Sequence, residues 1–243
     1  MPVNCRNCPI RRRDCFLPMS DSEIEAMGRF KSGELTVGPR SSILMEGSNS
    51  PQLFTVLEGQ GLRYKVLENG RRQVISFVFP GDFLGLQAGV MSEMKHSVES
   101  ATSMRLCVFE RANLWSFFRD HPERAFDLTW LAAVEEHFLG EKVLSLGQRS
   151  ATERIAWAFL RVWERLGALG LRTNGAVPFP HRQQDLADAL GLSLVHTNKT
   201  LARLRQLQVA GWSDGWLSVF DPGTLADLAL ADPGEAVPRR PLL

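Results

Sequence analysis

Cysteine thiols are the side chains of this sequence whose spacing points most directly to chemistry. The chain has four cysteines; Cys5, Cys8 and Cys15 fall within eleven residues, whereas Cys107 stands alone. Thiolates bind zinc and iron–sulfur clusters, and reactive thiolates also take part in redox exchange. The N-terminal group therefore indicates metal ligands, redox thiols or cysteines with no ligand, and these interpretations stay open at this point.

The composition is that of an ordinary globular protein. Apolar residues make up 44% and charged residues 23% of 243 residues, and the net charge is +1. No apolar run is long enough to span a membrane, and the first residues lack the apolar stretch of a secretory signal. We therefore expect a cytoplasmic protein with reduced cysteines and no membrane partner. Any contact with nucleic acid must come from a local basic face.

Enzyme signatures are missing from the sequence. It contains no dinucleotide-binding glycine motif, no phosphate-binding loop and no zinc-protease helix motif. One tyrosine and five scattered histidines offer little acid–base machinery. We therefore predict that the protein is not an enzyme.

The first half of the chain must supply the scaffold that carries Cys107. Glycines recur every 9 to 12 residues between positions 38 and 81, which is typical of short antiparallel strands. Strands are predicted at 53–59, 62–67, 73–79 and 103–109, and the last of them contains Cys107. Asn69-Gly70 predicts a hairpin turn between the second and third.

A long helix is predicted over residues 122–147. Pro122 and Glu123 suit the first turn of a helix. Apolar residues then recur at spacings of three and four, at Leu128, Leu131, Val134, Phe138, Leu139, Val143 and Leu146. Such a stripe indicates either packing within the chain or a seam between two chains. Ser150 and Glu153 form a capping box that begins the next helix, so the domain boundary is predicted near 147–150.

Residues 181–208 predict a helix-turn-helix. Leu186, Ala187 and Leu190 face inward, Gly191 makes the turn, and Ser193 caps the second helix. The N-terminal end of such a helix reaches base edges, where asparagine can pair with adenine and lysine can donate to guanine. The candidate DNA contacts are Ser193, His196, Thr197, Asn198, Lys199, Arg203 and Arg205. Residues 211–220 predict a hairpin wing, and the alternative for the isolated motif is a two-helix packing unit with a solvated basic face.

The order of these elements resembles the Crp/Fnr superfamily of bacterial transcription regulators. Residues 64–85, 148–160 and 183–205 carry the resemblance. It implies an α+β chain with an N-terminal antiparallel β-roll of the cyclic-nucleotide-binding type, a long dimerisation helix and a C-terminal winged helix-turn-helix. The expected parts are an arm (1–20), the β-roll (21–121), the dimerisation helix (122–147), the DNA-binding domain (148–226) and a tail (227–243).

The resemblance also implies the partners. It implies a homodimer that binds a palindromic site on double-stranded DNA and regulates transcription together with RNA polymerase. The seam of the homodimer would then lie on the long helix, at Leu131, Val134, Phe138 and Leu139. The Fnr pattern of Glu, Ser and Arg on the DNA-reading helix is replaced here by Val195, Asn198 and Lys199, so the half-site of Fnr cannot be carried over.

The resemblance offers two kinds of effector. The cyclic-nucleotide branch requires a Glu for the ribose and an Arg-Ser pair for the phosphate, but Leu86 and His96 stand at the Glu and Arg positions, and only Ser97 fits. The sequence therefore argues against a cyclic nucleotide.

The oxygen-sensing Fnr-like branch carries three N-terminal cysteines and one in the β-roll. Cys5, Cys8, Cys15 and Cys107 match these positions, which implies a [4Fe–4S] cluster that senses oxygen or nitric oxide. Two alternatives stay open. One is a regulator of this type without a cluster, which responds to another small molecule or redox signal. The other is a zinc-stabilised interaction module.

Overall fold

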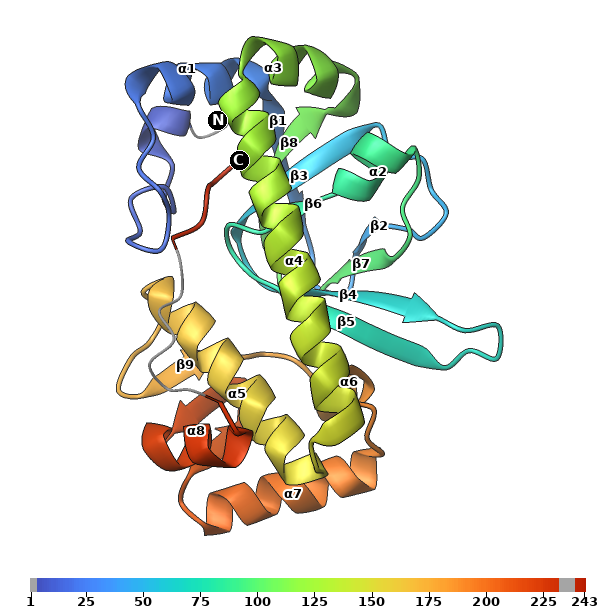
Figure 1. Ribbon diagram of the computed structural model, residues 1–243, viewed down its shortest axis with the longest axis vertical. Helices are drawn as coiled ribbons and strands as arrows, with labels where there is room; N and C mark the ends of the chain where they lie inside the picture. The colour runs from blue at the N-terminus through green and yellow to red at the C-terminus, as the bar shows by residue number, and fades with distance from the viewer. Residues whose placement is uncertain (1–3, 232–238) are drawn as a thin grey trace. The chain divides into compact units, whose positions relative to one another are not determined.

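The computed structural model describes residues 4–231 and 239–243, and these form two compact units (Figure 1). The first unit comprises Met1–Arg71, Ile75–Val134 and Arg239–Leu243, and the second comprises Arg72–Val74 and Glu135–Pro238. Residues 1–3 of the predicted arm and 232–238 of the predicted tail lie outside the described residues. None of the helices in the described ranges combines the length and apolarity that crossing a membrane requires.

The first unit is the predicted antiparallel β-roll with short helices around it. Its two four-stranded sheets have the strand orders β1-β8-β3-β6 and β2-β7-β4-β5. The strands are β1 (Lys31–Val37), β2 (Ser42–Leu44), β3 (Gln52–Glu58), β4 (Gly61–Val66), β5 (Arg72–Val78), β6 (Phe83–Leu84), β7 (Ser97–Ser100) and β8 (Met104–Glu110). The helical segments are η1 (Cys5–Asn7), α1 (Asp21–Phe30), α2 (Leu86–Met91), η2 (Arg111–Asn113) and α3 (Leu114–Asp120).

The four strands predicted from the sequence are present as β3, β4, β5 and β8. A buried apolar cluster includes Val56, Val78, Val98 and Leu106, which β3, β5, β7 and β8 contribute. Gly70 has a φ of +80°, which the tight turn between β4 and β5 requires. Burial of these apolar side chains thus explains why the segments form the roll: alternate residues are buried along β5, and consecutive residues are buried along β3 and β8.

Helix α1 is not among the elements predicted from the sequence. The signal for it is local, because Ser20 and Glu23 form a complete capping box at its start. Its buried side includes Ile24 and Met27, which also line the cavity described below.

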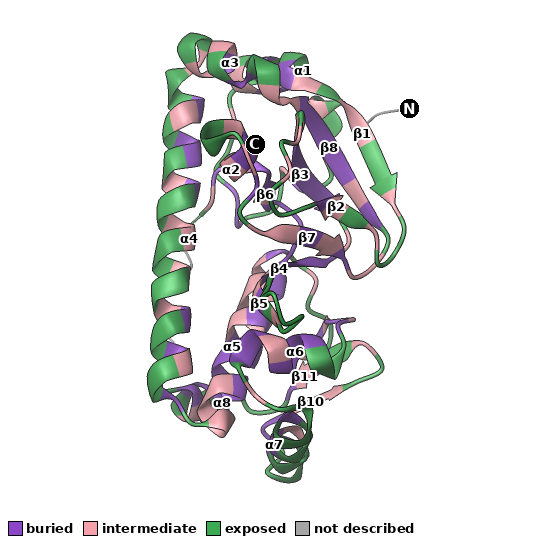
Figure 2. Cartoon of the chain, turned by 90° about the vertical axis from the view of Figure 1, so that its right-hand side faces the viewer, coloured by how far each residue is buried: buried purple, intermediate pink, exposed green. Residues whose placement is uncertain are grey.

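Helix α4 (Pro122–Gln148) is the predicted long helix, and the two units divide within it. One side is buried, and the other is exposed along its length (Figure 2). Near its start, Arg124 forms ion pairs with Asp127 at 2.9 Å and with Glu23 of α1, which holds this turn in the first unit.

The second unit is a winged helix-turn-helix. It contains α5 (Ala151–Ala168), β9 (Ala176–Pro178), α6 (Gln183–Leu190), α7 (Leu194–Gln206), β10 (Ala210–Ser213), β11 (Trp216–Val219) and α8 (Pro222–Ala229). The predicted capping box of Ser150 and Glu153 begins α5. Asp214 and Gly215 join β10 to β11 with φ values of 52° and 76°, and two successive positive φ values are typical of a type I′ hairpin turn. This hairpin is the predicted wing.

Candidate functional site

The turn between α6 and α7 has the conformation and the capping residue that the sequence predicts. Gly191 ends α6 in the left-handed region at φ 63°, and Leu186, Ala187 and Leu190 are buried. The Ser193 hydroxyl accepts a hydrogen bond from the backbone N–H of His196 at 3.2 Å, so it caps α7. The two helices are therefore held in the arrangement in which a second helix can enter a DNA groove.

Helix α7 exposes most of the predicted DNA contacts. The exposed side chains are Ser193, His196, Asn198, Lys199, Arg203 and Arg205, and α7 contains no acidic residue. Thr197 is the exception, because its side chain is fully buried and its hydroxyl donates to the Ser193 carbonyl oxygen at 3.1 Å. Its assignment as a DNA contact is therefore wrong; it holds the first turn of the helix instead.

Mutations in α7 should distinguish contacts to bases from contacts to phosphates. Lys199→Ala and Asn198→Ala should each reduce discrimination between a selected duplex and a random one, by about 1–3 kcal/mol, because base contacts carry sequence information. Arg203→Ala should weaken binding to all duplexes alike and flatten its salt dependence, because phosphate contacts only position the protein. Gln206→Ala, on the same helix, is the control. Unchanged sequence preference in Lys199→Ala would show that another segment reads the bases.

Cys107 lies in the middle of the first unit, on one face of the sheet β1-β8-β3-β6. In register, Cys107 of β8 pairs with Thr55 of β3 on one side and with Glu34 of β1 on the other. Directly paired residues project from the same face of a sheet, and Phe109, two residues beyond Cys107, does so too. Thr55, Leu57, Cys107 and Phe109 form one wall of a cavity of about 40 Å³. Side chains of α1 and of the N-terminal segment lie opposite.

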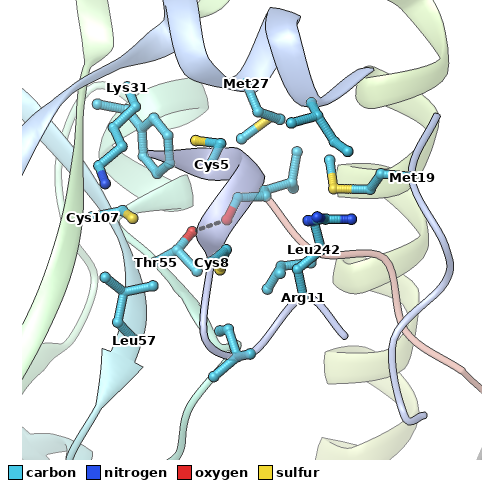
Figure 3. A pocket seen from close by; sticks show the side chains of 14 residues that line it. Cys5, Cys8, Arg11, Met19, Met27, Lys31, Thr55, Leu57, Cys107 and Leu242 are labelled. Carbon is cyan, nitrogen blue, oxygen red and sulfur yellow. Dashed lines mark hydrogen bonds between the residues drawn. The ribbon is translucent and has the colours of Figure 1, made fainter. Parts of the chain in front are cut away.

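Three of the four cysteines meet at this cavity. Cys5 and Cys8 line it from η1 and the residue after it, and Cys107 lines it from β8 (Figure 3). The fourth, Cys15, is buried but does not line the cavity, and its backbone carbonyl oxygen accepts a hydrogen bond from the Arg240 N–H at 2.8 Å. The structure thus brings together thiols that are distant in sequence.

A largely buried ion pair flanks these thiols. Lys31 and Glu34 of β1 pair at 2.6 Å, with side chains 7% and 11% exposed, and Lys31 lines the cavity. Burial raises the pKa of Cys107 to about 12, although Lys31 acts in the opposite direction. Burial also raises the pKa of Cys5. Both thiols are therefore protonated at neutral pH, and a metal that binds them must displace protons.

The C-terminal residues contribute to the same cavity, which the sequence did not indicate. Leu242 and Leu243 are buried and line it, and the Thr55 hydroxyl donates to the Leu243 carbonyl oxygen. Within residues 4–231 and 239–243, no group of three or more His, Cys, Asp or Glu side chains is arranged so that it could hold a metal ion without rearrangement. Three thiols are thus gathered at one cavity, and the two C-terminal leucines are part of its lining.

Two residues inside the β-roll, His96 and Arg63, bear on whether the roll can bind a cyclic nucleotide. His96 stands where the resemblance requires an arginine; burial, with a further contribution from Arg63, lowers its pKa to about 4. Arg63 itself is buried and donates to the Ser76 hydroxyl and the Phe83 carbonyl oxygen, both at 3.1 Å. A neutral imidazole at position 96 lacks the charge that a buried phosphate requires. This is consistent with the expectation that no cyclic nucleotide binds, which remains a prediction.

The four residues predicted for the dimer seam differ in how far the chain itself buries them. The Leu131 side chain is buried within the chain, and Val134 is partly buried. The Phe138 ring stacks on that of Trp157, with 6.0 Å between centroids. Of the four predicted seam residues only Leu139 is exposed. The large apolar side chains of α4 that are exposed are Phe126 in the first unit and Leu139, Val143 and Leu144 in the second; we call these four residues the α4 stripe.

A β-roll followed by a long helix and a winged helix-turn-helix with a basic exposed helix defines a DNA-binding transcription regulator. The sequence matches the cyclic nucleotide-binding domain at residues 34–121 and the Crp-like helix-turn-helix domain at residues 153–228. The nitrogen fixation regulation protein FixK of Bradyrhizobium diazoefficiens is 32% identical, over 93% of this chain and 94% of its own length.

Two further comparisons agree. The transcriptional activatory protein AadR of Rhodopseudomonas palustris is 31% identical, over 88% of this chain and 87% of its own length. The solved structure of FixK2 from Bradyrhizobium japonicum is 26% identical and superposes with a TM-score of 0.74, over 82% of this chain and 98% of FixK2. The chain therefore belongs to the Crp/Fnr family of transcription regulators.

Proposed function

We propose that this regulator binds palindromic double-stranded DNA as a homodimer and senses oxygen or nitric oxide through a [4Fe–4S] cluster held by Cys5, Cys8, Cys15 and Cys107. The observation that carries the proposal is the convergence of Cys5, Cys8 and Cys107 on one cavity. Packing alone does not require thiols from an N-terminal turn and from a central strand to meet here, because apolar side chains of similar volume would fill the same space.

The donor set fits an iron–sulfur cluster. Cysteine thiolates are the usual ligands of such a cluster. A labile iron–sulfur cluster is broken down by oxygen, which makes it suitable as an oxygen sensor. Lys31 and Arg11 line the same cavity, and their positive charges would offset the negative charge of four thiolates. Cys15 would be the fourth ligand, and its thiol would have to turn toward the cavity.

Ligation at these positions would join distant parts of the first unit. Cys5 and Cys8 belong to the arm, and Cys107 belongs to the strand between β1 and β3. A cluster bound by cysteines of the arm and of β8 would hold the arm against the sheet. The arm already contacts α1, since Arg6 pairs with Glu25 at 2.7 Å. Glu23 of α1 pairs in turn with Arg124 of α4, so ion pairs of α1 reach both the arm and the first turns of α4. We propose that the state of the arm acts on α4 along these contacts.

The α4 stripe supports the homodimer. Phe126 and Val143 are 71% and 70% exposed, so the chain itself leaves this apolar surface of α4 uncovered. A second copy that packs on this stripe would bury it and would supply a second α7 for the other half of a palindrome.

The proposal is tested by purification under strict exclusion of air. We expect visible absorption from an iron–sulfur cluster and close to four iron and four sulfide ions per chain. Exposure to air should bleach the absorption. Protein purified without air that holds no iron, or that holds zinc in its place, would contradict the cluster and leave the family assignment intact.

A further inference from the structure

The last described residues of the chain are bound to the first unit at several points. Arg240 pairs with Phe16 as in a short parallel ladder: the Leu17 N–H donates to the Arg240 carbonyl oxygen at 2.9 Å, and the Arg240 N–H donates to Cys15. The Arg240 guanidinium pairs with the buried Asp82 at 3.3 Å. These contacts fix the direction of the chain as it enters the cavity. Figure 1 shows this C-terminal segment beside the N-terminal one.

Beyond Arg240, Leu242 and Leu243 line the thiol cavity. Pro241, Leu242 and Leu243 are all buried. The hydrogen bond from Thr55 to Leu243 lies among the side chains of Cys5, Cys8 and Cys107 (Figure 3). Thr55 is the direct register partner of Cys107, so the leucine backbone is anchored beside this thiol.

The remaining space is small for a cofactor. A cavity of about 40 Å³ accommodates roughly three water molecules. A four-iron, four-sulfide core contains four sulfide ions, each larger than a water molecule, in addition to its iron. The thiols therefore cannot enclose such a group while Leu242 and Leu243 hold their places, whereas moving two side chains at the end of a segment requires no rearrangement of the sheet.

We propose that Leu242 and Leu243 form an intramolecular plug of the thiol cavity, and that the plug and a cofactor held by Cys5, Cys8 and Cys107 are alternative occupants of one site. The competition with a cofactor rests on the proposed function, whereas the plug itself does not. In the apoprotein the leucines keep water and oxidants from the thiols. Loading of the site expels them, so the exposure of residues 239–243 reports the state of the site.

The plug is tested in the full-length apoprotein, which needs no cofactor. Native alkylation by a maleimide, followed by peptide mass spectrometry, gives a rate for each cysteine. In the double variant Leu242→Asn/Leu243→Asn, the rates at Cys5, Cys8 and Cys107 should rise at least about tenfold, because polar amides lose the apolar burial that holds the plug. Thr55→Val removes the hydrogen-bond donor without altering the tail, and it should accelerate the same cysteines to a smaller extent.

Two controls separate release of the plug from unfolding. Cys15 should keep its rate in the double variant, because the pairing of Arg240 with Phe16 and Asp82 is retained. Leu230→Asn replaces a leucine that is 66% exposed in the second unit and should change no rate. A double variant that alkylates at the wild-type rate would overturn the plug, and so would one in which all four cysteines accelerate together.

A second measurement tests the competition. Hydrogen exchange of residues 239–243 is followed in the wild type before and after anaerobic incubation with equal amounts of ferrous and ferric iron and with sulfide. We expect faster exchange after loading. Unchanged exchange in a protein that has bound iron would overturn the competition. Protein that binds no iron, but whose double variant still alkylates faster, would overturn the proposed function and leave the plug supported.

Discussion

Cys107→Ser should abolish iron binding and, with it, tight binding to operator DNA in the absence of air. A serine hydroxyl is a poor ligand for an iron–sulfur cluster, and the central position of Cys107 between Thr55 and Glu34 offers no other thiol from the sheet. Cys5→Ser, Cys8→Ser and Cys15→Ser should each have the same effect. The measurement is iron and sulfide content together with affinity for a duplex selected by the wild type.

Stability controls keep this experiment interpretable. Cys107 is only 9% exposed, so a buried hydroxyl should cost about 1–3 kcal/mol of the unfolding free energy, which denaturant unfolding will show. Cys107→Ala carries no hydroxyl, so it should lose iron to the same extent. Wild-type iron content in Cys15→Ser, with loss in the other three variants, would contradict the four-cysteine ligand set.

Val143→Glu and Phe126→Glu should convert the protein from dimer to monomer. Both replace an exposed side chain of the α4 stripe with a charge that a second copy would have to bury. A palindromic site needs two α7 helices, so affinity for the selected duplex should fall by roughly 10²–10⁴-fold. Sedimentation equilibrium and DNA titration measure the two effects.

A matched control is available on α2. Val90 is 68% exposed, so Val90→Glu introduces the same charge at similar exposure away from α4 and should leave the dimer intact. Phe138→Glu should instead lower the unfolding free energy, because Phe138 packs on Trp157. Sedimentation that is unchanged in Val143→Glu would place the interface elsewhere.

Local signals made much of the fold predictable. Asn69-Gly70, the Ser150–Glu153 capping box, Gly191 and Asp214-Gly215 each dictate a backbone conformation through their own chemistry, and all four appear in the structure as predicted. The resemblance then supplied the order of the parts, because the joint occurrence of such signals is far more specific than any one of them.

The side of a helix that a residue occupies was harder to predict. Leu131 and Phe138 are as apolar as Phe126 and Val143, so hydrophobic spacing alone shows two stripes on α4 and does not say which one the chain itself buries. Thr197 lies among exposed polar residues in the sequence, but the period of the helix turns it inward.

The cavity itself depends on tertiary contacts. Cys107 meets Cys5 and Cys8 because β8 is central in its sheet, which the sequence suggested only through the resemblance. The leucines at 242 and 243 carried no signal, because binding of a tail depends on a long-range ladder with Phe16 rather than on local pattern. These contacts became visible only in the structure.

The proposed function requires that occupation of the thiol cavity controls DNA binding. Its most direct test is a titration of anaerobic wild-type protein with oxygen, in which cluster iron, bound sulfide and affinity for the selected duplex are measured on the same samples. We expect affinity to fall in proportion to the loss of cluster iron, and Cys107→Ser to show the oxidised affinity from the start. Affinity that stays constant while the iron is lost would contradict the account.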